Sequence, residues 1–588
     1  MKATLAILWT ILWIFLTEFF FMPIWSFSAS SGMYWNIIIY SGIMAVILYK
    51  HDDGEFSPAS KVFTVIAAIS FVIQLCIGIF GSWALVHADE YRSLIGEIKQ
   101  TEFTSNIQAI APNQMLIVDK EIAQRIGSKE LGSDPGLGSR AELGEFTLQP
   151  VDGKLYWIAP LIHSGFWKWN SFGDQGTPGY VRVSATNQED YALVRTTQDG
   201  KDIHIVYQTG AYFGKDLERH IYTNGYRSKL YKEYQFEVDD NWNPYWTVTL
   251  YENKIGFNGG DAVGVLVVQP ETGEIKSYSV KDAPAWVDRI QPADFVSDQV
   301  DDWGEYVHGY WNWSNRDVLR VAENSSLVLG ADGHSYFYYG LTSSGNDQST
   351  VGFVMVDTRS KQAHWFKQAG ATEDAAKKSA EGKVQQMGYV GSDGITYNIE
   401  GYPTYEFLLK DKAGLMKQIA LVNVHDHTIV GVGESRHEAM RDYHDQLTNR
   451  GNAVGASTSD MDKIKIRSVV SRFASEVVKG NTYYYFVLAK SPSKLFTSGS
   501  SLSDELPLTK EGDVVSISYI ESSSGEISIM DFDNTNIGIV KDSIQIGNES
   551  SIDSVRTVKI ETKSEKVVDS KWENLTPEEK KALMKKSK

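Results

Sequence analysis

The sequence predicts a membrane-anchored α+β protein with three N-terminal transmembrane helices, tandem antiparallel β-rich modules and a small C-terminal β-barrel. Three long apolar runs occupy the first 88 residues. From Thr147 onward, apolar and aromatic residues alternate between Asn, Asp and Gly turns, as in antiparallel strands. The stretch Asn449–Asp460 is rich in Gly, Ser and Asn and precedes five short strand-like segments. We therefore predict a transmembrane anchor (1–88), a helical stalk with a Gly-rich loop (89–146), two β-rich α+β lobes (147–300 and 301–455), a small barrel (456–545) and a charged tail with a short helix (546–588).

The apolar runs are Ala3–Trp25, Met33–Tyr49 and Val62–Ala88. A helix needs about 20 apolar residues to cross the hydrocarbon core of a bilayer. The third run contains no Asp, Glu, Lys or Arg and is the strongest candidate for a span. The first run also fits a signal peptide with Lys2 as its basic region, although it is longer than usual and lacks a clear cleavage site. Glu18 in this run is either an intramembrane proton or partner site or an interfacial carboxylate near its outer end.

The flanking charges predict the orientation. Lys2 precedes the first run, and Lys50 and Lys61 lie in the second connection, whereas the first connection is uncharged. The positive-inside rule then places the N-terminus and the second connection in the cytoplasm. Three spans would put residues 89–588 in the periplasm or outside the cell, so we expect an integral protein of a bacterial inner membrane.

Composition excludes several classes of protein. The chain has 56 Lys and Arg against 74 Asp and Glu, a net charge of −18, which argues against a nucleic-acid partner. The single cysteine, Cys76, lies in the third apolar run. A single cysteine excludes a disulfide framework and a Cys-based zinc site, and its position in an apolar run excludes a catalytic cysteine.

A strand, a connection and a strand–turn–strand hairpin recur along the β-rich region. The copies are Tyr245–Leu250 with Gly264–Tyr278, Tyr336–Leu341 with Gly352–Phe366, Thr404–Leu409 with Ile419–Val432 and, more weakly, Tyr156–Leu161 with Gly179–Ala185. We expect helices over Gly214–Ser228 and Glu373–Met387, the second capped by Thr372. A further helix, Ser435–Leu447, should pack on the last sheet.

The stretch Val267–Tyr278 (VVQPETGEIKSY) resembles the strand–turn–strand ending of PepSY-type domains, which are extracytoplasmic modules. A helix over a curved antiparallel sheet is likewise similar to a cystatin-like arrangement. The resemblance implies α+β modules with inhibitory or regulatory roles outside the cytoplasm.

The C-terminal strand-like segments predict a five-stranded barrel, either OB-like or SH3-like. The expected strands are Ile466–Val478, Thr482–Ala489, Lys494–Phe496, Val514–Tyr519 and Glu526–Phe532. The aromatic run Tyr483–Phe486 either forms a stacking platform or belongs to the sheet, and the acidity of the chain favours the sheet.

A concentration of aromatic residues between the two predicted lobes is the best candidate for a binding surface. Exposed Trp and Tyr side chains anchor sugars or proteins, whereas buried ones would fill the junction between the lobes. The candidates are Trp286, Trp303, Tyr306, Tyr310, Trp311 and Trp313.

Signals for catalysis or metal binding are sparse. Four histidines within 20 residues are candidates for a metal site: His425, His427, His437 and His444. They lack the H-E-x-x-H spacing of zinc proteases, and we expect no metal there and no cofactor. Adjacent carboxylates such as Asp301 and Asp302 could serve hydrolysis, but adjacency in sequence does not set their separation in space.

The favoured function is that of a non-enzymatic membrane protein that presents a large binding or scaffolding domain to an envelope partner, protein or glycan. The alternative is an extracytoplasmic hydrolase of glycans or peptides with an unrecognised carboxylate pair. The expected partners include the lipid bilayer and exclude nucleic acid, and the sequence leaves homo-oligomer formation open.

Overall fold

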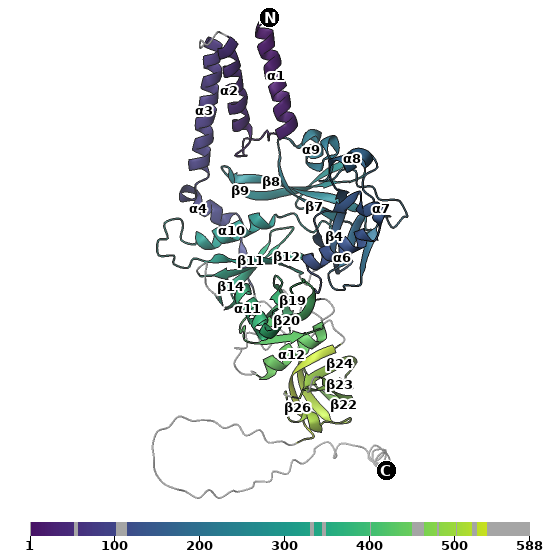
Figure 1. Cartoon of the computed structure of the whole chain (residues 1–588). Coiled ribbons are helices and arrows are strands. Elements are labelled where there is room, and N and C mark those ends of the chain that lie inside the picture. Colours follow the sequence, from purple (N-terminus) through teal and green to yellow (C-terminus); the bar gives the residue numbers. More distant parts are fainter. Residues whose placement is uncertain are drawn as a thin grey trace, which may run out of the picture. The chain divides into compact units, whose positions relative to one another are not determined.

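The structure is a computed structural model that describes residues 2–51, 57–101, 115–329, 334–343, 349–367, 369–399, 402–449, 464–478, 481–500, 502–519 and 526–537 (Figure 1). These residues belong to one compact unit, Met1–Gly538. The predicted linker (Asn449–Asp460) falls almost entirely outside the described residues, and the predicted charged tail lies wholly outside them.

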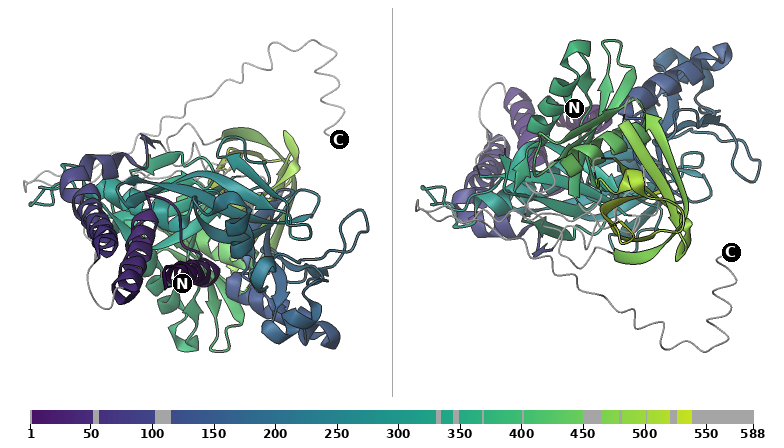
Figure 2. Two further views of the ribbon diagram at one scale, coloured as in Figure 1. Left: turned by 90° about the horizontal axis from the view of Figure 1, so that it is seen from above. Right: turned by 90° about the horizontal axis from the view of Figure 1, so that it is seen from below.

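Three apolar helices begin the chain, α1 (Lys2–Phe21), α2 (Met33–His51) and α3 (Pro58–Cys76). Ser57 caps α3 by accepting a hydrogen bond from the Ser60 amide, and Pro58 occupies the first turn, where its missing N–H costs nothing. The Ser60 hydroxyl donates to the Ala45 carbonyl at 3.1 Å and so joins α3 to α2. Figure 2 shows the three helices grouped together.

One helix among the described residues is long and apolar enough to cross a membrane, the 24-residue Pro58–Gly81. It consists of α3 and a π-helical turn, η1 (Ile77–Gly81). The described apolar parts of the other two helices, Leu8–Phe21 and Met33–Tyr49, are shorter, at 10–17 residues. At 1.5 Å per residue these apolar parts are shorter than a hydrocarbon core about 30 Å thick, whereas α1 and α2 as a whole have 20 and 19 residues. The structure thus shows one candidate span where the sequence predicts three.

Four sheets follow, and each contains a meander of four successive antiparallel positions, the first of which is shared by two short strands in sheets 1 and 4. Sheet 1 contains β2 (Ala141–Leu143) and β3 (Thr147–Val151), which both pair with β4 (Lys154–His163), followed by β5 (Tyr180–Ser184) and β6 (Tyr191–Val194). Sheet 2 contains β7 (Leu230–Val238), β8 (Pro244–Ile255), β9 (Asn258–Val268) and β10 (Ile275–Ser279).

Sheets 3 and 4 repeat this pattern. Sheet 3 contains β11 (Arg320–Leu329), β12 (Ser335–Thr342), β14 (Gly352–Asp357) and β15 (Ala363–Phe366), with β1 (Ile98–Gln100) parallel to β15. Sheet 4 contains β17 (Val390–Gly391) and β18 (Ile395–Ile399), which both pair with β19 (Tyr402–Lys410), followed by β20 (Met416–Asn423) and β21 (Val430–Gly433). All four copies of the hairpin unit seen in the sequence are therefore present. A separate two-stranded sheet pairs β13 (Ser349–Thr350) with β16 (Gly370–Ala371).

The sheets pack face to face in the order 2-1-4-3. One hydrophobic core joins sheet 1 to sheet 4, a second joins sheet 1 to sheet 2, and a third joins sheet 3 to sheet 4. Near the first strands of three sheets, Leu148, Leu327 and Ile395 belong to one further cluster. This order resembles the packing of blades in a β-propeller, in which four-stranded sheets surround a common centre.

Sheets 2 and 3 are joined differently, through the segment 283–305. Its first part covers sheet 2 with Val287 and Ile290, and its helix α10 (Ala293–Glu305) covers sheet 3 with Val296 and Val300. The lobe boundary predicted at residue 300 falls inside α10, and the division into lobes stays a prediction.

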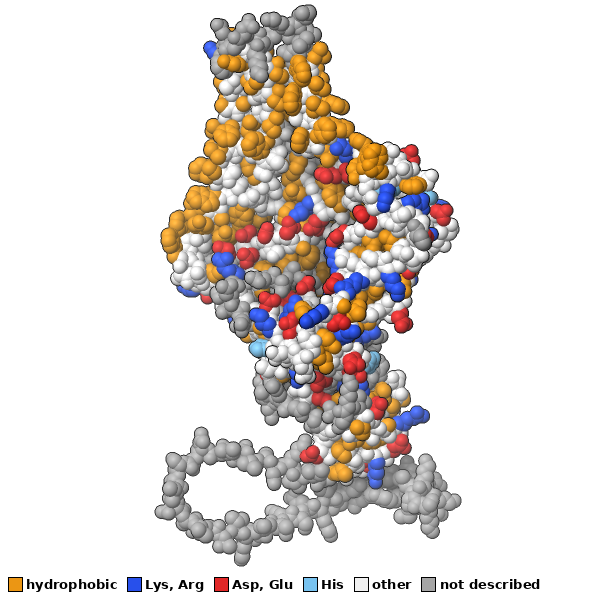
Figure 3. All heavy atoms as spheres, viewed as in Figure 1, with side chains coloured by type: hydrophobic (Ala, Val, Ile, Leu, Met, Phe, Trp, Pro, Cys, Tyr) orange, Lys and Arg blue, Asp and Glu red, His pale blue; other side chains and the backbone are white. Residues whose placement is uncertain are grey.

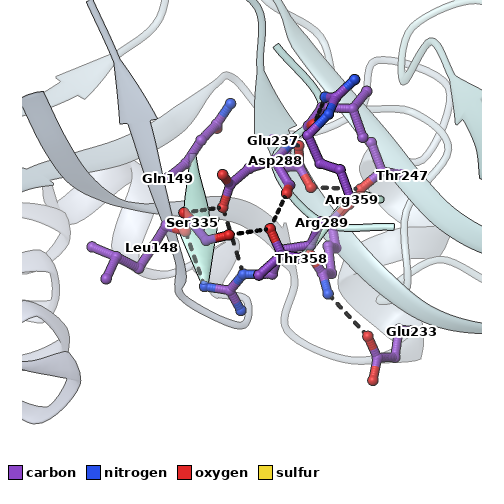
Figure 4. Close-up of polar contacts among 12 residues, drawn as sticks. Leu148, Gln149, Glu233, Glu237, Thr247, Asp288, Arg289, Ser335, Thr358 and Arg359 are labelled. Carbon is purple, nitrogen blue, oxygen red and sulfur yellow. Dashed lines mark hydrogen bonds and ion pairs between the residues drawn. The ribbon is translucent and has the colours of Figure 1, made fainter. Parts of the chain in front are cut away.

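A buried polar cluster holds this junction together (Figure 4). The amide of Asp288 donates to the Glu237 carboxyl of β7 at 2.9 Å, and Ser335 of β12 donates to the Asp288 carboxyl at 3.0 Å. Thr358 donates to the Asp288 carbonyl at 2.7 Å. Buried polar groups must be hydrogen-bonded, so this cluster specifies how the two sheets meet.

The predicted stalk and Gly-rich loop (89–146) are wrong in part. Helix α4 (Ala84–Ser93) ends early, and Gly96 has a φ of +84° just before β1. The Gly-rich stretch contains the end of α6 (Lys120–Gly132) and a short turn of helix, α7 (Pro135–Gly138). An Asp caps each helix, and Ile122, Ala123 and Leu131 of α6 are core residues, which overcomes the low helix propensity of Gly.

The other predicted helices are present with changed lengths. The predicted helix over Gly214–Ser228 is the short α9 (Leu217–Ile221) followed by a π-helical turn, η4 (Tyr222–Tyr226). Helix α11 (Glu373–Lys383) begins at the predicted Thr372 cap. Helix α12 (Arg436–Asn449) packs on sheet 4 through Ala439 and Tyr443, as predicted.

The C-terminal strands close into the predicted barrel. Its strands are β22 (Ile464–Val478), β23 (Asn481–Leu488), β24 (Ser491–Gly499), β25 (Val514–Tyr519) and β26 (Glu526–Asn534). They pair in the order β22-β23-β24-β26-β25 with β24 parallel to β26. This order is that of an OB-fold and resolves the choice that the sequence left open.

Candidate functional site

The connection between α1 and α2 (residues 22–32) lies against sheet 2 and α9. The Trp25 amide donates to the Arg227 carbonyl at 2.8 Å, and Asn253 of β8 donates to the Ser28 carbonyl at 2.8 Å. Tyr222 donates to the Glu18 carboxylate at 2.7 Å, and Trp25 donates to the same group at 2.8 Å. Glu18 is therefore held by two donors at the end of α1, one of them from the β-rich body.

The apolar helix Pro58–Gly81 is also joined to the body by specific contacts. The Ser82 hydroxyl accepts from the Phe257 amide at 2.8 Å, and Tyr91 of α4 donates to the Ser82 carbonyl at 2.7 Å. Arg92 donates to the Trp303 carbonyl of α10 at 2.9 Å. Helix α4 thus ties the end of this helix to the segment between sheets 2 and 3.

A cleft of about 580 Å³ lies between these connections. Its walls come from residues 24–31, from the β8–β9 hairpin and from α10. Three carboxylates of α10 line it: Asp298, Asp301 and Asp302. Their spacing of three and four residues places them on one face of the helix.

The cleft is acidic because its described lining contains these three carboxylates and no Lys or Arg. Lys232 pairs with Asp294, and Arg320 pairs with Glu305. Asp301 accepts a hydrogen bond from the Val321 amide at 2.8 Å.

These surroundings change the acidity of the other two carboxyls. Burial, together with the charges of Asp298 and Asp301, raises the pKa of Asp302 to about 7. Burial and the nearby Asp294 also raise the pKa of Asp298. The cleft can therefore gain negative charge near neutral pH, as functional sites often do.

The predicted aromatic surface divides into two groups. Trp286 stacks on Tyr245 with ring centroids 4.9 Å apart, and Trp303 lies 6.0 Å from Trp365. Tyr306 lies 6.4 Å from the ring of Tyr91. These three candidates, Trp286, Trp303 and Tyr306, pack between elements and do not form a free platform.

The other three candidates are exposed. Trp311 and Trp313 are 62% and 84% exposed, and their rings stack at 5.7 Å. Tyr310 meets Trp311 edge-on at 5.5 Å. They line a hollow of about 440 Å³ together with Trp83, which follows the apolar helix and which the sequence analysis missed.

A second group of exposed aromatic residues was also missed. Helix α8 (Phe166–Phe172) presents Trp167, which is 78% exposed, and packs Phe166 against Phe213. Phe213 in turn lies 6.4 Å from Phe19 of α1. Proximity of α8 to α1 depends on the tertiary fold and leaves no local signal in the sequence.

The four histidines lie on two sides of sheet 4. His425 contacts the Ala369 carbonyl at 2.8 Å, and His427 contacts the Ser379 hydroxyl of α11 at 2.9 Å. His437 and His444 belong to α12, where His444 is buried. Within the described ranges, no group of three or more His, Cys, Asp or Glu side chains could hold a metal ion.

The aromatic run of the barrel is structural. Tyr484 and Phe486 belong to the barrel core. Tyr483 donates to the Asp445 carboxyl of α12 at 2.7 Å, and Arg441 donates to Tyr485 at 3.2 Å. These rings fill the barrel or hold it to α12.

Comparison with known proteins gives little. No protein-family model matches the chain, and no curated protein matches it. A solved structure, the GH32 β-fructofuranosidase BmSUC1 of Bombyx mori, shares 10% identity over 69% of this chain and 71% of that chain, with a TM-score of 0.16. A similarity this low shows neither a common fold nor a common activity.

Proposed function

We propose that the protein is a membrane-anchored scaffold that presents its β-rich body outside the cytoplasm and binds an envelope partner in the acidic cleft. Three helices would anchor it: Pro58–Gly81 is long enough to cross the membrane by itself, and α1 and α2 would lie beside it in the bilayer. The basic residues that flank the helices favour residues 89–588 in the periplasm or outside the cell.

The observation that carries the proposal is the position of the cleft. Its walls include the connection between two apolar helices, residues 24–31, and the acidic face of α10. The apolar helix Pro58–Gly81 enters the body beside it through Ser82 and α4. A partner in the cleft would therefore contact both the anchor and the body.

The cleft favours a cationic partner segment. Asp298 and Asp302 line it, and its lining among the described residues contains no Lys or Arg. A Lys- or Arg-rich segment of a protein would complement these charges, and electrostatic complementarity contributes mainly to specificity and association rate.

Protease digestion of intact spheroplasts tests the orientation. We expect the β-rich body to be cut while the bilayer is intact. If the body survives until the membrane is dissolved, the proposed orientation is wrong.

Affinity capture from solubilised membranes tests the cleft. The double variant Asp298→Asn and Asp302→Asn should capture at least tenfold less partner than the unaltered protein. Asp199→Asn, an exposed carboxylate in the turn after β6, is the matched control and should capture the partner normally. Equal capture by the unaltered protein, the double variant and the control variant would reject the cleft as the binding site.

A second candidate function, hydrolysis, is favoured by one observation. The raised pKa of Asp302 beside a second carboxylate fits a general acid paired with a base or nucleophile. Assay of the purified protein against peptidoglycan and peptide substrates tests it. Turnover that Asp302→Asn abolishes would favour the enzyme over the scaffold.

A further inference from the structure

In the part of the β-rich body that the structure describes, exposed large aromatic side chains gather at two places, and each place adjoins the end of an apolar helix. Soluble surfaces seldom gather such residues without a partner. Figure 3 shows hydrophobic side chains over the helices and at the shoulders of the body where the helices meet it. We define the aromatic rim as the two groups together: Trp83, Tyr310, Trp311, Trp313, Trp167 and Phe213.

The first group is continuous with the apolar helix that ends at Gly81. Trp83 is 44% exposed and lines the same hollow as Trp311 and Trp313. The loop that carries these residues follows α10, whose Trp303 carbonyl is bound by Arg92 of α4. The loop is therefore held at a definite level relative to the end of the helix.

The second group adjoins the end of α1. Arg219 donates to the Phe19 carbonyl at 2.7 Å, and its guanidinium lies 4.9 Å from the Phe19 ring centroid. Phe213 packs beside Phe19, and Trp167 projects from the neighbouring helix α8. Two helix ends thus carry exposed aromatic rings of the same kind.

Trp and Tyr have an apolar ring and a polar N–H or O–H, and they are enriched where membrane proteins cross the headgroup layer. Cationic side chains also suit this layer. Arg316 is exposed close to Trp313 in sequence, and Lys168 adjoins Trp167. Each group adjoins the end of an apolar helix, so a bilayer that holds these helices is the occupant that the arrangement favours.

We propose that the aromatic rim lies in the lipid headgroup layer and fixes the orientation of the β-rich body on the membrane. This inference rests on the membrane anchor of the proposed function. It changes the role of Tyr310, Trp311 and Trp313 from protein or glycan binding to lipid contact.

Spin labelling of the full chain in phosphatidylcholine–phosphatidylglycerol nanodiscs tests the inference. The native Cys76, exposed on α3, reports on the anchor. Trp313→Cys and Trp167→Cys, each in a Cys76→Ser background, report on the rim. Leu508→Cys on the barrel is the matched control because Leu508 is an apolar residue that is 60% exposed.

We expect labels at 313 and 167 to be at least threefold less accessible to nickel–EDDA than the label at 508, and more accessible to oxygen. Equal accessibility at 313, 167 and 508 with a lipid-exposed Cys76 would overturn the rim and leave the anchor intact. A water-accessible Cys76 would instead overturn the anchor. Protection of 313 and 167 in native membranes alone, and not in nanodiscs, would assign the rim to a protein or glycan partner and reject the lipid contact.

Discussion

At the residue scale, Glu237 has an unusual position for a carboxyl group. It is fully buried between sheets 2 and 3, where it accepts hydrogen bonds from the Asp288 amide at 2.9 Å and the Thr247 hydroxyl at 3.0 Å (Figure 4). Burial, reinforced by the charge of Asp288, raises the pKa of Glu237 to about 7. The protonated form is therefore favoured in the folded protein.

Glu237→Gln should reduce the pH dependence of stability. Because the folded pKa lies above the ordinary value, the parent loses stability as pH rises from about 4.5 to 7, by up to about 3 kcal/mol. Glutamine keeps the size and cannot ionise. Chemical denaturation at pH 5 and pH 8 should show a smaller difference in unfolding free energy for the variant. An unchanged difference would mean that Glu237 does not titrate in this range.

Asp302 should make binding in the cleft stronger as pH rises, whereas Glu237 makes the fold less stable as pH rises. Its carboxyl, with a pKa of about 7, becomes charged as pH rises through neutrality. Binding of a lysine-rich peptide should therefore strengthen several-fold between pH 5.5 and 8, measured by fluorescence anisotropy. Asp302→Asn should flatten this profile. A profile that is identical in the variant would assign the pH dependence to another group.

At the element scale, the contact between α12 and sheet 4 depends on two glycines. A Cβ at Gly431 would lie 2.2 Å from the Tyr443 amide nitrogen, and one at Gly433 would lie 2.3 Å from the Ala439 amide nitrogen. Both neighbours are backbone atoms of α12, which cannot move without the whole helix. The close approach of helix and sheet therefore requires residues without a side chain.

Gly431→Ala should lower the free energy of unfolding by about 1–3 kcal/mol because the helix must shift away from the sheet. Gly382→Ala in α11 is the matched control, because a Cβ there has no atom within 4 Å. Alanine in this helix should be neutral or stabilising by up to about 1 kcal/mol. Thermal denaturation compares the two, and equal effects would show that the space under α12 is not limiting.

At the scale of the whole molecule, the described residues contain hydrophobic cores of two kinds. The cores of the four sheets share faces with one another, whereas the barrel core contains only residues from 466 onward. The hydrogen bonds of Asp445 and Arg441 to the tyrosines of β23 join the barrel to α12. Cores without shared residues can unfold separately.

Scanning calorimetry should therefore show two transitions. Phe496→Ala removes a fully buried ring from the barrel, and Phe407→Ala removes one from the core between sheets 3 and 4. Each loss should cost about 3–5 kcal/mol in its own transition. We expect the other transition to keep its midpoint. Movement of both midpoints by either variant would show that barrel and sheets unfold together.

Local patterns in the sequence determined many, though not all, of the elements of this protein. Alternating residues predicted the hairpins of sheets 2, 3 and 4 and two strands of sheet 1, and β25 was predicted at its observed bounds, Val514–Tyr519. These predictions succeeded because strand alternation and turn formation depend on residues that are close in the sequence. The predicted Gly-rich loop failed at the end of α6 and at α7 because core contacts of Leu131 and Leu137 outweigh the local glycines.

Tertiary structure alone decided how these elements meet. The strand order of the barrel, the junction through Asp288 and the cleft of Asp298 and Asp302 each join residues far apart in the chain. Burial likewise divided six similar aromatic candidates into three packed and three exposed side chains. The physical reason is that face-to-face packing and desolvation depend on neighbours in space, which no local pattern of residues records.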